Sequence, residues 1–167
     1  ALKAITENMD SAISADIDPN RINIVIPEDF ELPPGGVHGR WPDKPLDQEW
    51  RLNKYKIYAA REFARVNGIN RIVLDSPNAR LGIVTSGKAY LDVMQALEDM
   101  GIDEAVAAEV GLRVYKVGMP WPLEPRTTAE FAQGLEEILV VEEKRSVIED
   151  QLTGQLYNYA SDSRPRV

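Results

Sequence analysis

The segment from Gly82 to Ala89 nearly matches the phosphate-binding loop G-x4-G-K-[ST]. In that loop, backbone amides cradle phosphate, and a hydroxyl residue after the lysine holds magnesium. Here Ala89 replaces the hydroxyl residue, and Ile83 and Val84 after Gly82 are both β-branched, as in a buried strand. We therefore predict a tight strand-to-helix turn. One alternative stays open, in which Ser86-Gly87-Lys88 binds a small anion or nucleotide at the start of the helix.

Two adjacent carboxylates, Glu142 and Glu143, directly follow the last predicted strand. Paired carboxylates can perform acid–base catalysis, but successive side chains leaving a strand point apart. We instead predict charge pairing with Lys144, Arg145 or another domain, and a position near the N-terminus of the next helix. His38 lies in a proline-rich stretch without the partner that a general base needs, so we predict surface hydrogen bonding for it.

Two tryptophans are candidate interface residues. Trp121 lies between Pro120 and Pro122, which makes it a stiff aromatic residue. We predict that it anchors a neighbouring domain, and the alternative is that it covers the protein's own core. Trp41 is the second interface candidate, and we expect it to hold the segment around it against the surface.

The spacing of apolar residues predicts a three-layer α/β/α fold with a mostly parallel sheet. Residues three and four apart predict helices, and β-branched or alternating runs predict strands. Strands and helices alternate, which requires crossover connections and favours parallel strands. The predicted strands are 72–74, 81–85, 112–117 and 137–141, and the predicted helices are one ending at 67–68, then 88–100, 103–110, 127 or 128 to 134, and 146–157.

The predicted core combines residues from both kinds of element. Thr127 or Thr128 is expected to cap its helix. The core residues are expected to be Ile83, Val84, Val114, Val117, Ile138 and Val140 from the strands, with Tyr90, Val93, Met94, Leu97, Met100, Val147, Ile148, Leu152 and Leu156 from the helices.

Residues 21–47 predict an ordered connector between two domains, because they are rich in proline and glycine. Ile22 to Ile26 are mostly β-branched and predict a short extended piece that Pro27 ends. We expect the tail of a preceding domain in residues 1–20, an α/β domain in 48–160 and the start of a linker in 161–167. The abrupt ends at Ala1 and Val167 predict a piece of a longer polypeptide, although tag removal would explain the first end alone.

The composition excludes several functions. The 167 residues are 44% hydrophobic and 28% charged, as in a soluble globular domain. The absence of cysteine and the single histidine exclude disulfides, cysteine-ligated clusters and multi-histidine metal sites within this sequence. A net charge of −8 argues against nucleic-acid binding. No apolar run is long enough to span a bilayer, so we predict no membrane partner and a cytoplasmic setting.

Four segments carry a resemblance to a known family. They are residues 26–36, 80–88, 114–119 and 134–145. The amino-acid sequences of these segments and their order along the chain resemble those of the indolepyruvate ferredoxin oxidoreductases in their long fused bacterial form. The chain is similar to the middle domain of such enzymes, which resembles the C-terminal domain of transketolase and follows a pyrimidine-type thiamine diphosphate domain.

The resemblance implies a parent enzyme with thiamine diphosphate, magnesium and iron–sulfur clusters. That enzyme would oxidatively decarboxylate an aryl 2-oxoacid, pass electrons to ferredoxin and yield an acyl-CoA. The sequence contains no thiamine diphosphate motif and no cluster cysteines, so we expect no catalytic, cofactor or metal residues in this chain. Its partners are expected to be the flanking domains, and contact of Ser86-Gly87-Lys88 or Glu142-Glu143 with those domains or with CoA is a hypothesis.

Two alternatives remain open beside a non-catalytic domain of this enzyme. The first is a free-standing small-anion or nucleotide module that uses Ser86-Gly87-Lys88. The second is an interaction adaptor that works through Trp121 and the proline-rich connector.

Overall fold

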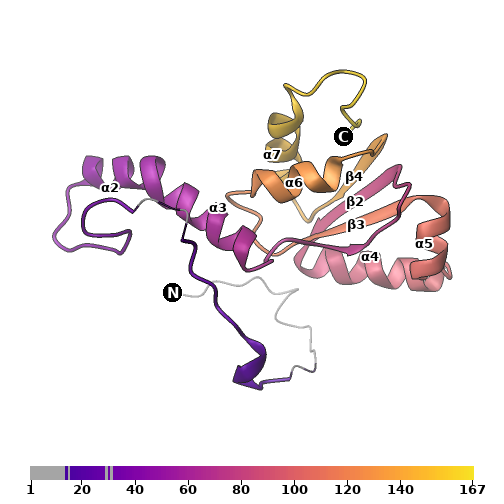
Figure 1. Ribbon diagram of the computed structural model, residues 1–167, viewed down its shortest axis with the longest axis horizontal. Helices are drawn as coiled ribbons and strands as arrows, with labels where there is room; N and C mark the ends of the chain where they lie inside the picture. Colours follow the sequence, from indigo (N-terminus) through magenta and orange to yellow (C-terminus); the bar gives the residue numbers. More distant parts are fainter. Residues whose placement is uncertain (1–13, 15, 29, 31) are drawn as a thin grey trace.

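Four strands form one mixed sheet in the order β1–β3–β2–β4 (Figure 1). The computed structural model describes residues 14, 16–28, 30 and 32–167. β2 (Leu81–Ser86) lies between β3 (Leu112–Val117) and β4 (Glu137–Val141) and runs parallel to both. β1 (Arg71–Leu74) is an edge strand and runs antiparallel to β3. The predicted α/β fold with a mostly parallel sheet is confirmed.

Helices cover both faces of the sheet, so the fold has three layers (Figure 1). α6 (Pro125–Ala132) and α7 (Val147–Leu156) lie on one face, and α4 (Gly87–Asp99) and α5 (Glu104–Val110) on the other. Neighbouring strand residues point to opposite faces, so Val84 enters the core under α6 and α7 while Ile83 enters the core over α4 and α5. The first core also contains Tyr115, Val117, Leu123, Phe131, Leu135, Ile138, Ile148, Leu152 and Leu156, and the second contains Leu74, Leu97, Ala107, Leu112 and Val114.

A helical arm, residues 45–66, projects from the sheet (Figure 1). It consists of α2 (Pro45–Arg51), a π-helical turn (Leu52–Lys56) and α3 (Ile57–Val66). The predicted end at Asn67 and Gly68 is confirmed, because Asn67 is the C-cap and Gly68 has a φ of 57°. A short 3-10 turn (Pro19–Arg21) lies in the segment that precedes the arm.

Three details of the predicted elements are wrong. α6 begins at Pro125 with Glu124 as its cap, so Thr127 and Thr128 lie inside the helix. Met100 is 64% exposed because it follows the last turn of α4, beyond the core. Val147, at the first position of α7, is 42% exposed and so is not a core residue.

The run from Ile22 to Ile26, which was predicted as an extended piece, forms no strand ladder in the described residues. Its backbone is instead held by the side chain of Asn67. The Val25 amide donates to Asn67 Oδ1 at 2.8 Å, and Asn67 Nδ2 donates to the Val25 carbonyl at 2.8 Å. The Asn67 side chain therefore satisfies both backbone hydrogen-bonding groups of Val25.

The predicted domain limits stay predictions. Most of the expected tail, residues 1–13 and 15, lies outside the described residues. At the other end, Arg166 forms an isolated parallel bridge with Glu137 at the start of β4. The Ile138 amide donates to the Arg166 carbonyl at 2.7 Å, so the last described residues are hydrogen-bonded to the sheet.

Candidate functional site

The carboxyl ends of the three parallel strands bring the predicted site residues to one edge of the sheet. Ser86 lies beside Val117 in the register of β2 and β3, and Thr85 lies beside Val141 in the register of β2 and β4. Ser86-Gly87-Lys88 and Glu142-Glu143 therefore leave adjacent strands at the same edge. This is the edge at which ligands bind in open α/β sheets.

The turn after β2 has the geometry that the sequence predicts. Gly87 has a φ of 57°, which favours glycine, and α4 starts there. Lys88 Nζ donates to both carboxylate oxygens of Asp92 at 2.8 Å. This hydrogen bond raises the pKa of Lys88. An anion at this turn would compete with Asp92 for the ammonium group.

Gly82 has a packing role in β2. A Cβ at this position would lie 2.4 Å from Leu135 Cδ1 and 2.7 Å from Phe131 Cζ. Leu135 and Phe131 are both buried in the core under α6 and α7. The glycine that begins the near-match to a phosphate loop is thus explained by the close approach of buried side chains to the strand.

The two carboxylates after β4 have different surroundings. Glu142 accepts hydrogen bonds from the amides of Ile148, at 2.7 Å, and Glu149, at 3.1 Å, and so caps the first turn of α7. The predicted position near the helix N-terminus is therefore found for Glu142. Glu143 is exposed. Within the described residues, neither carboxylate forms an ion pair with Lys144 or Arg145.

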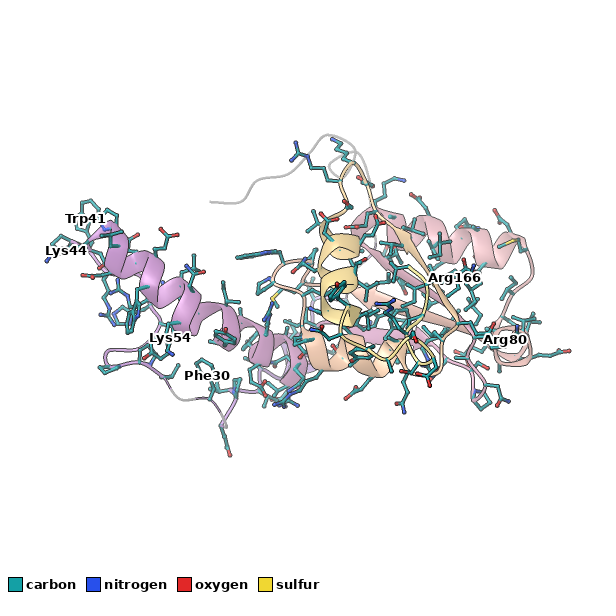
Figure 2. The ribbon with its side chains drawn as sticks, turned by 90° about the horizontal axis from the view of Figure 1, so that it is seen from above. Phe30, Trp41, Lys44, Lys54, Arg80 and Arg166 are labelled. Atoms are coloured by element: carbon teal, nitrogen blue, oxygen red, sulfur yellow. The ribbon has the colours of Figure 1, made fainter. Side chains whose placement is uncertain are left out.

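Both candidate tryptophans present their rings to solvent. Trp121 is 58% exposed and lines a surface hollow with Lys144, Arg145 and the start of α7. Trp41 is 93% exposed at the far end of the arm (Figure 2), so it does not hold its own segment down. That segment is fixed by polar contacts instead: Arg51 pairs with Asp43, and Arg40 donates to the Pro34 carbonyl at 2.9 Å.

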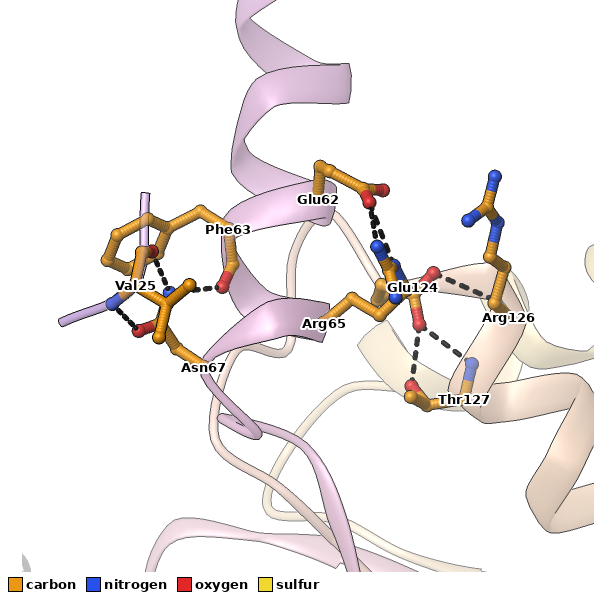
Figure 3. Close-up of polar contacts among 8 residues, drawn as sticks. All are labelled: Val25, Glu62, Phe63, Arg65, Asn67, Glu124, Arg126 and Thr127. Atoms are coloured by element: carbon orange, nitrogen blue, oxygen red, sulfur yellow. Dashed lines mark hydrogen bonds and ion pairs between the residues drawn. The ribbon is translucent and has the colours of Figure 1, made fainter. Parts of the chain in front are cut away.

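A buried polar network was missed by the sequence prediction. Glu124 is only 2% exposed and accepts hydrogen bonds from the Arg126 amide at 2.8 Å and from the Thr127 amide and hydroxyl at 2.7 Å (Figure 3). The Thr127 hydroxyl also bonds the Tyr115 hydroxyl at 2.7 Å. Burial raises the pKa of Tyr115. Pro125, at the start of α6, is a helix-start signal that the sequence does contain.

Asn70 connects the base of the arm to the carboxyl edge of the sheet. Its Oδ1 accepts hydrogen bonds from the amides of Gly118 and Met119, both at 2.9 Å. Asn70 is buried, and no sequence motif distinguishes it. The loop after β3 is thereby held next to the residue that precedes β1.

The sheet, with helices on both faces, defines an α/β domain in which loops at the carboxyl edge connect parallel strands to the covering helices. Residues 70–167 match the family model for the indolepyruvate ferredoxin oxidoreductase middle domain. The chain therefore belongs to this family, which confirms the resemblance to the middle domain of an indolepyruvate ferredoxin oxidoreductase. The matched region begins at Asn70 and does not include the arm.

Similar curated proteins are subunits named IorA of indolepyruvate oxidoreductase. The subunit from Methanothermobacter marburgensis is 34% identical over 97 residues, which cover 58% of this chain and 14% of that protein. The subunit from Pyrococcus abyssi is 36% identical over 75 residues, which cover 45% and 10%. The chain thus spans a small part of the length of these relatives.

A solved structure of 2-oxoglutarate:ferredoxin oxidoreductase from Magnetococcus marinus is also similar. It aligns with 98% of this chain and 26% of its own, at 18% sequence identity and a TM-score of 0.40. In the described part of the chain, His, Asp and Glu side chains form no group of three suited to a metal ion. No helix among those residues is long and apolar enough to cross a membrane.

Proposed function

We propose that this chain is a non-catalytic interdomain unit of an indolepyruvate ferredoxin oxidoreductase. The observation that carries the proposal is the row of exposed large apolar side chains along the arm and the segment before it. These are Ile17, Ile22, Ile24, Ile26, Leu32, Trp41, Leu46, Trp50, Leu52 and Tyr58, all more than a third exposed. Exposed apolar side chains in such number are typical of a surface that another protein segment covers.

The flanking domains of the same polypeptide are the proposed partners of this surface. The family match supports this, because the chain spans at most 14% of the relatives just described. Trp41 and Trp121 are the aromatic anchors, and Glu143 offers an exposed charge at the carboxyl edge. Residues 48–160 form the proposed domain core, between a tail in 1–20 with a connector in 21–47 and a linker that starts in 161–167.

The parent enzyme of the proposal is the long fused bacterial form and works in the cytoplasm. It decarboxylates an aryl 2-oxoacid, transfers the two released electrons through iron–sulfur clusters to ferredoxin, and joins the acyl group to CoA. Thiamine diphosphate and magnesium are its other cofactors. All of these groups are proposed to bind outside this chain, whose own role is to position the domains that hold them.

The first test is the mass of the native polypeptide. An antibody against this chain is used on a lysate of the source cells. We expect a band several times larger than 18.7 kDa. A native band at 18.7 kDa would contradict the proposal, because no flanking domain would then exist on the same polypeptide.

A second test addresses the non-catalytic role. The isolated chain is titrated with thiamine diphosphate and magnesium in a calorimeter. We expect no binding heat, whereas the native polypeptide should bind the cofactor. Micromolar binding by the isolated chain would show that it holds part of the catalytic site and would overturn the proposed role.

A further inference from the structure

We propose that the hollow between α3 and α6 binds a monocarboxylate through Arg61 and Arg126. The hollow has a volume of about 500 Å³ and lies at the base of the arm. It is lined by Phe30, Tyr58, Arg61, Glu62, Glu124, Pro125 and Arg126. The inference does not depend on the proposed function, and none of the residues predicted from the sequence as site residues takes part.

The guanidinium groups of Arg61 and Arg126 can accommodate a further acceptor. Arg61 Nε is buried and has no hydrogen-bond partner among the described residues. In Figure 3 the Arg126 side chain extends from the start of α6 and points away from the bonds of Glu124, and its guanidinium forms no hydrogen bond among the described residues. Neither guanidinium forms an ion pair within the part of the chain that the structure describes. A buried donor without a partner is costly, and an anion in the hollow removes that cost.

The acidic groups of the hollow already have partners. Glu62 accepts a hydrogen bond from Arg65 Nε at 2.9 Å (Figure 3). This bond, with a smaller contribution from the charge of Arg126, lowers the pKa of Glu62. Glu124 is bonded to the start of α6 and to Thr127. The carboxylates therefore leave Arg61 and Arg126 available for another anion.

The balance of charge indicates an anion with a single charge. Among the described residues, three arginines, at 61, 65 and 126, lie near two glutamates, so these five side chains together carry one positive charge in a chain with a net charge of −8. A monoanion neutralises this cluster, whereas a phosphate dianion would leave it negative next to two carboxylates. Guanidinium groups also match the planar, bidentate geometry of a carboxylate.

The remaining lining indicates what the carboxylate is attached to. Tyr58 and Phe30 contribute aromatic rings to the hollow, and Tyr58 is half exposed. An apolar or aromatic body can pack against these rings while its carboxylate contacts the arginines. A free aryl carboxylic acid and a glutamate or aspartate side chain from a docked segment share this chemistry.

The experiment follows the Nε–Hε resonances of the arginines by NMR while the chain is titrated with sodium benzoate at constant ionic strength. We expect saturable shifts of the Arg61 and Arg126 resonances, with benzoate binding more tightly than acetate and inorganic phosphate. Arg61→Gln and Arg126→Gln should each weaken benzoate binding by about tenfold, since each removes a charge-assisted hydrogen bond. Lys144→Gln is the control, because Lys144 is an exposed cation elsewhere and forms no ion pair with any described residue.

Shifts that never saturate, or an equal loss of binding in Lys144→Gln, would overturn the proposal, because the anion would then only screen charge. If Arg61→Gln fails to fold, Arg61→Lys keeps the charge and removes the bidentate geometry, and it should also weaken binding. Calorimetry with benzoate on the native polypeptide then identifies the source of the carboxylate. Retained binding indicates a free acid, and binding lost there but present in the isolated chain indicates an acidic side chain of a flanking segment.

Discussion

At position 82 the β2 strand has room for a hydrogen atom and nothing larger. The Gly82→Ala methyl group would overlap Leu135 and Phe131, and both are buried. We expect Gly82→Ala to lower the free energy of unfolding by about 1–3 kcal/mol, as overpacking does. Urea denaturation measures this change.

Gly154→Ala is the matched control for that substitution. Gly154 lies inside α7, and a Cβ there meets no atom within 4 Å. Alanine in a helix interior should raise the free energy of unfolding by about 0.5–1 kcal/mol. If both variants change stability in the same direction, the close packing at Gly82 does not explain that glycine.

Tyr115 should make the fold sensitive to alkaline pH. Burial raises its pKa above the ordinary value of 10.0, so the folded chain keeps the phenolic proton when the unfolded chain has begun to lose it. The folded state then binds more protons, and the free energy of unfolding must fall as the pH rises above about 10. Urea denaturation between pH 8 and 11 should show a smaller fall in Tyr115→Phe than in the natural chain. Equal slopes would contradict the prediction.

The Glu142 carboxylate caps the first turn of α7. Glu142→Ala leaves the amides of Ile148 and Glu149 without this acceptor and should cost about 1 kcal/mol of stability. Faster hydrogen exchange of these amides would locate the effect. Glu143→Ala, at the exposed neighbouring carboxylate, should change stability by less than about 0.5 kcal/mol. A similar loss in both variants would mean that charge alone, without capping, stabilises α7.

Asn67 attaches the segment around Val25 to the end of α3. We expect Asn67→Ala to accelerate hydrogen exchange of the Val25 amide, because that amide loses its acceptor. Exchange in β2 and β3 should stay slow. Asn53→Ala removes an exposed side-chain bond to the Glu49 carbonyl and should leave Val25 unchanged. Unchanged exchange at Val25 in Asn67→Ala would show that other contacts hold this segment.

Periodicity predicted most elements because their burial follows the sequence pattern. β2 and β4 are mostly apolar runs, β3 alternates apolar and charged residues, and α5 lies between Asp103 as its cap and Gly111 with a φ of 81°. Strand direction has no such local signal, so the antiparallel β1 could not be predicted from residues 71–74. Ile22 to Ile26 has strand propensity but pairs with no strand in the part of the chain that the structure describes, because pairing depends on the whole fold.

Part of the candidate site was also accessible from sequence. The shared edge of Ser86-Gly87-Lys88 and Glu142-Glu143 follows from parallel strand order alone. The hydrogen-bond partners of these residues, such as Asp92 for Lys88, do not follow from strand order. The hollow with Arg61 and Arg126 unites residues 65 positions apart in the chain, and no motif connects them.

We expect flanking domains of the native polypeptide to cover the arm. Hydroxyl-radical footprinting compares the isolated chain with the native polypeptide, using the urea-unfolded chain as the reference for each side chain. Trp41 and Trp50 are exposed in the isolated chain and should react rapidly there. We expect their oxidation to slow at least severalfold in the native polypeptide. Equal oxidation in both would mean that no flanking domain covers the arm.

The direction of β1 determines where the arm is attached. Arg71, at the start of β1, pairs with Lys116 near the end of β3, so the chain passes from the arm into the sheet at the carboxyl edge. Asn70 hydrogen-bonds the loop after β3 at the same place. The 22 residues of the arm form a lever roughly 33 Å long, and a rotation of about 10° at its base moves the far end by about 6 Å. If the arm rotates as a rigid body, a small displacement at the carboxyl edge of the sheet is therefore accompanied by a large displacement near Trp41.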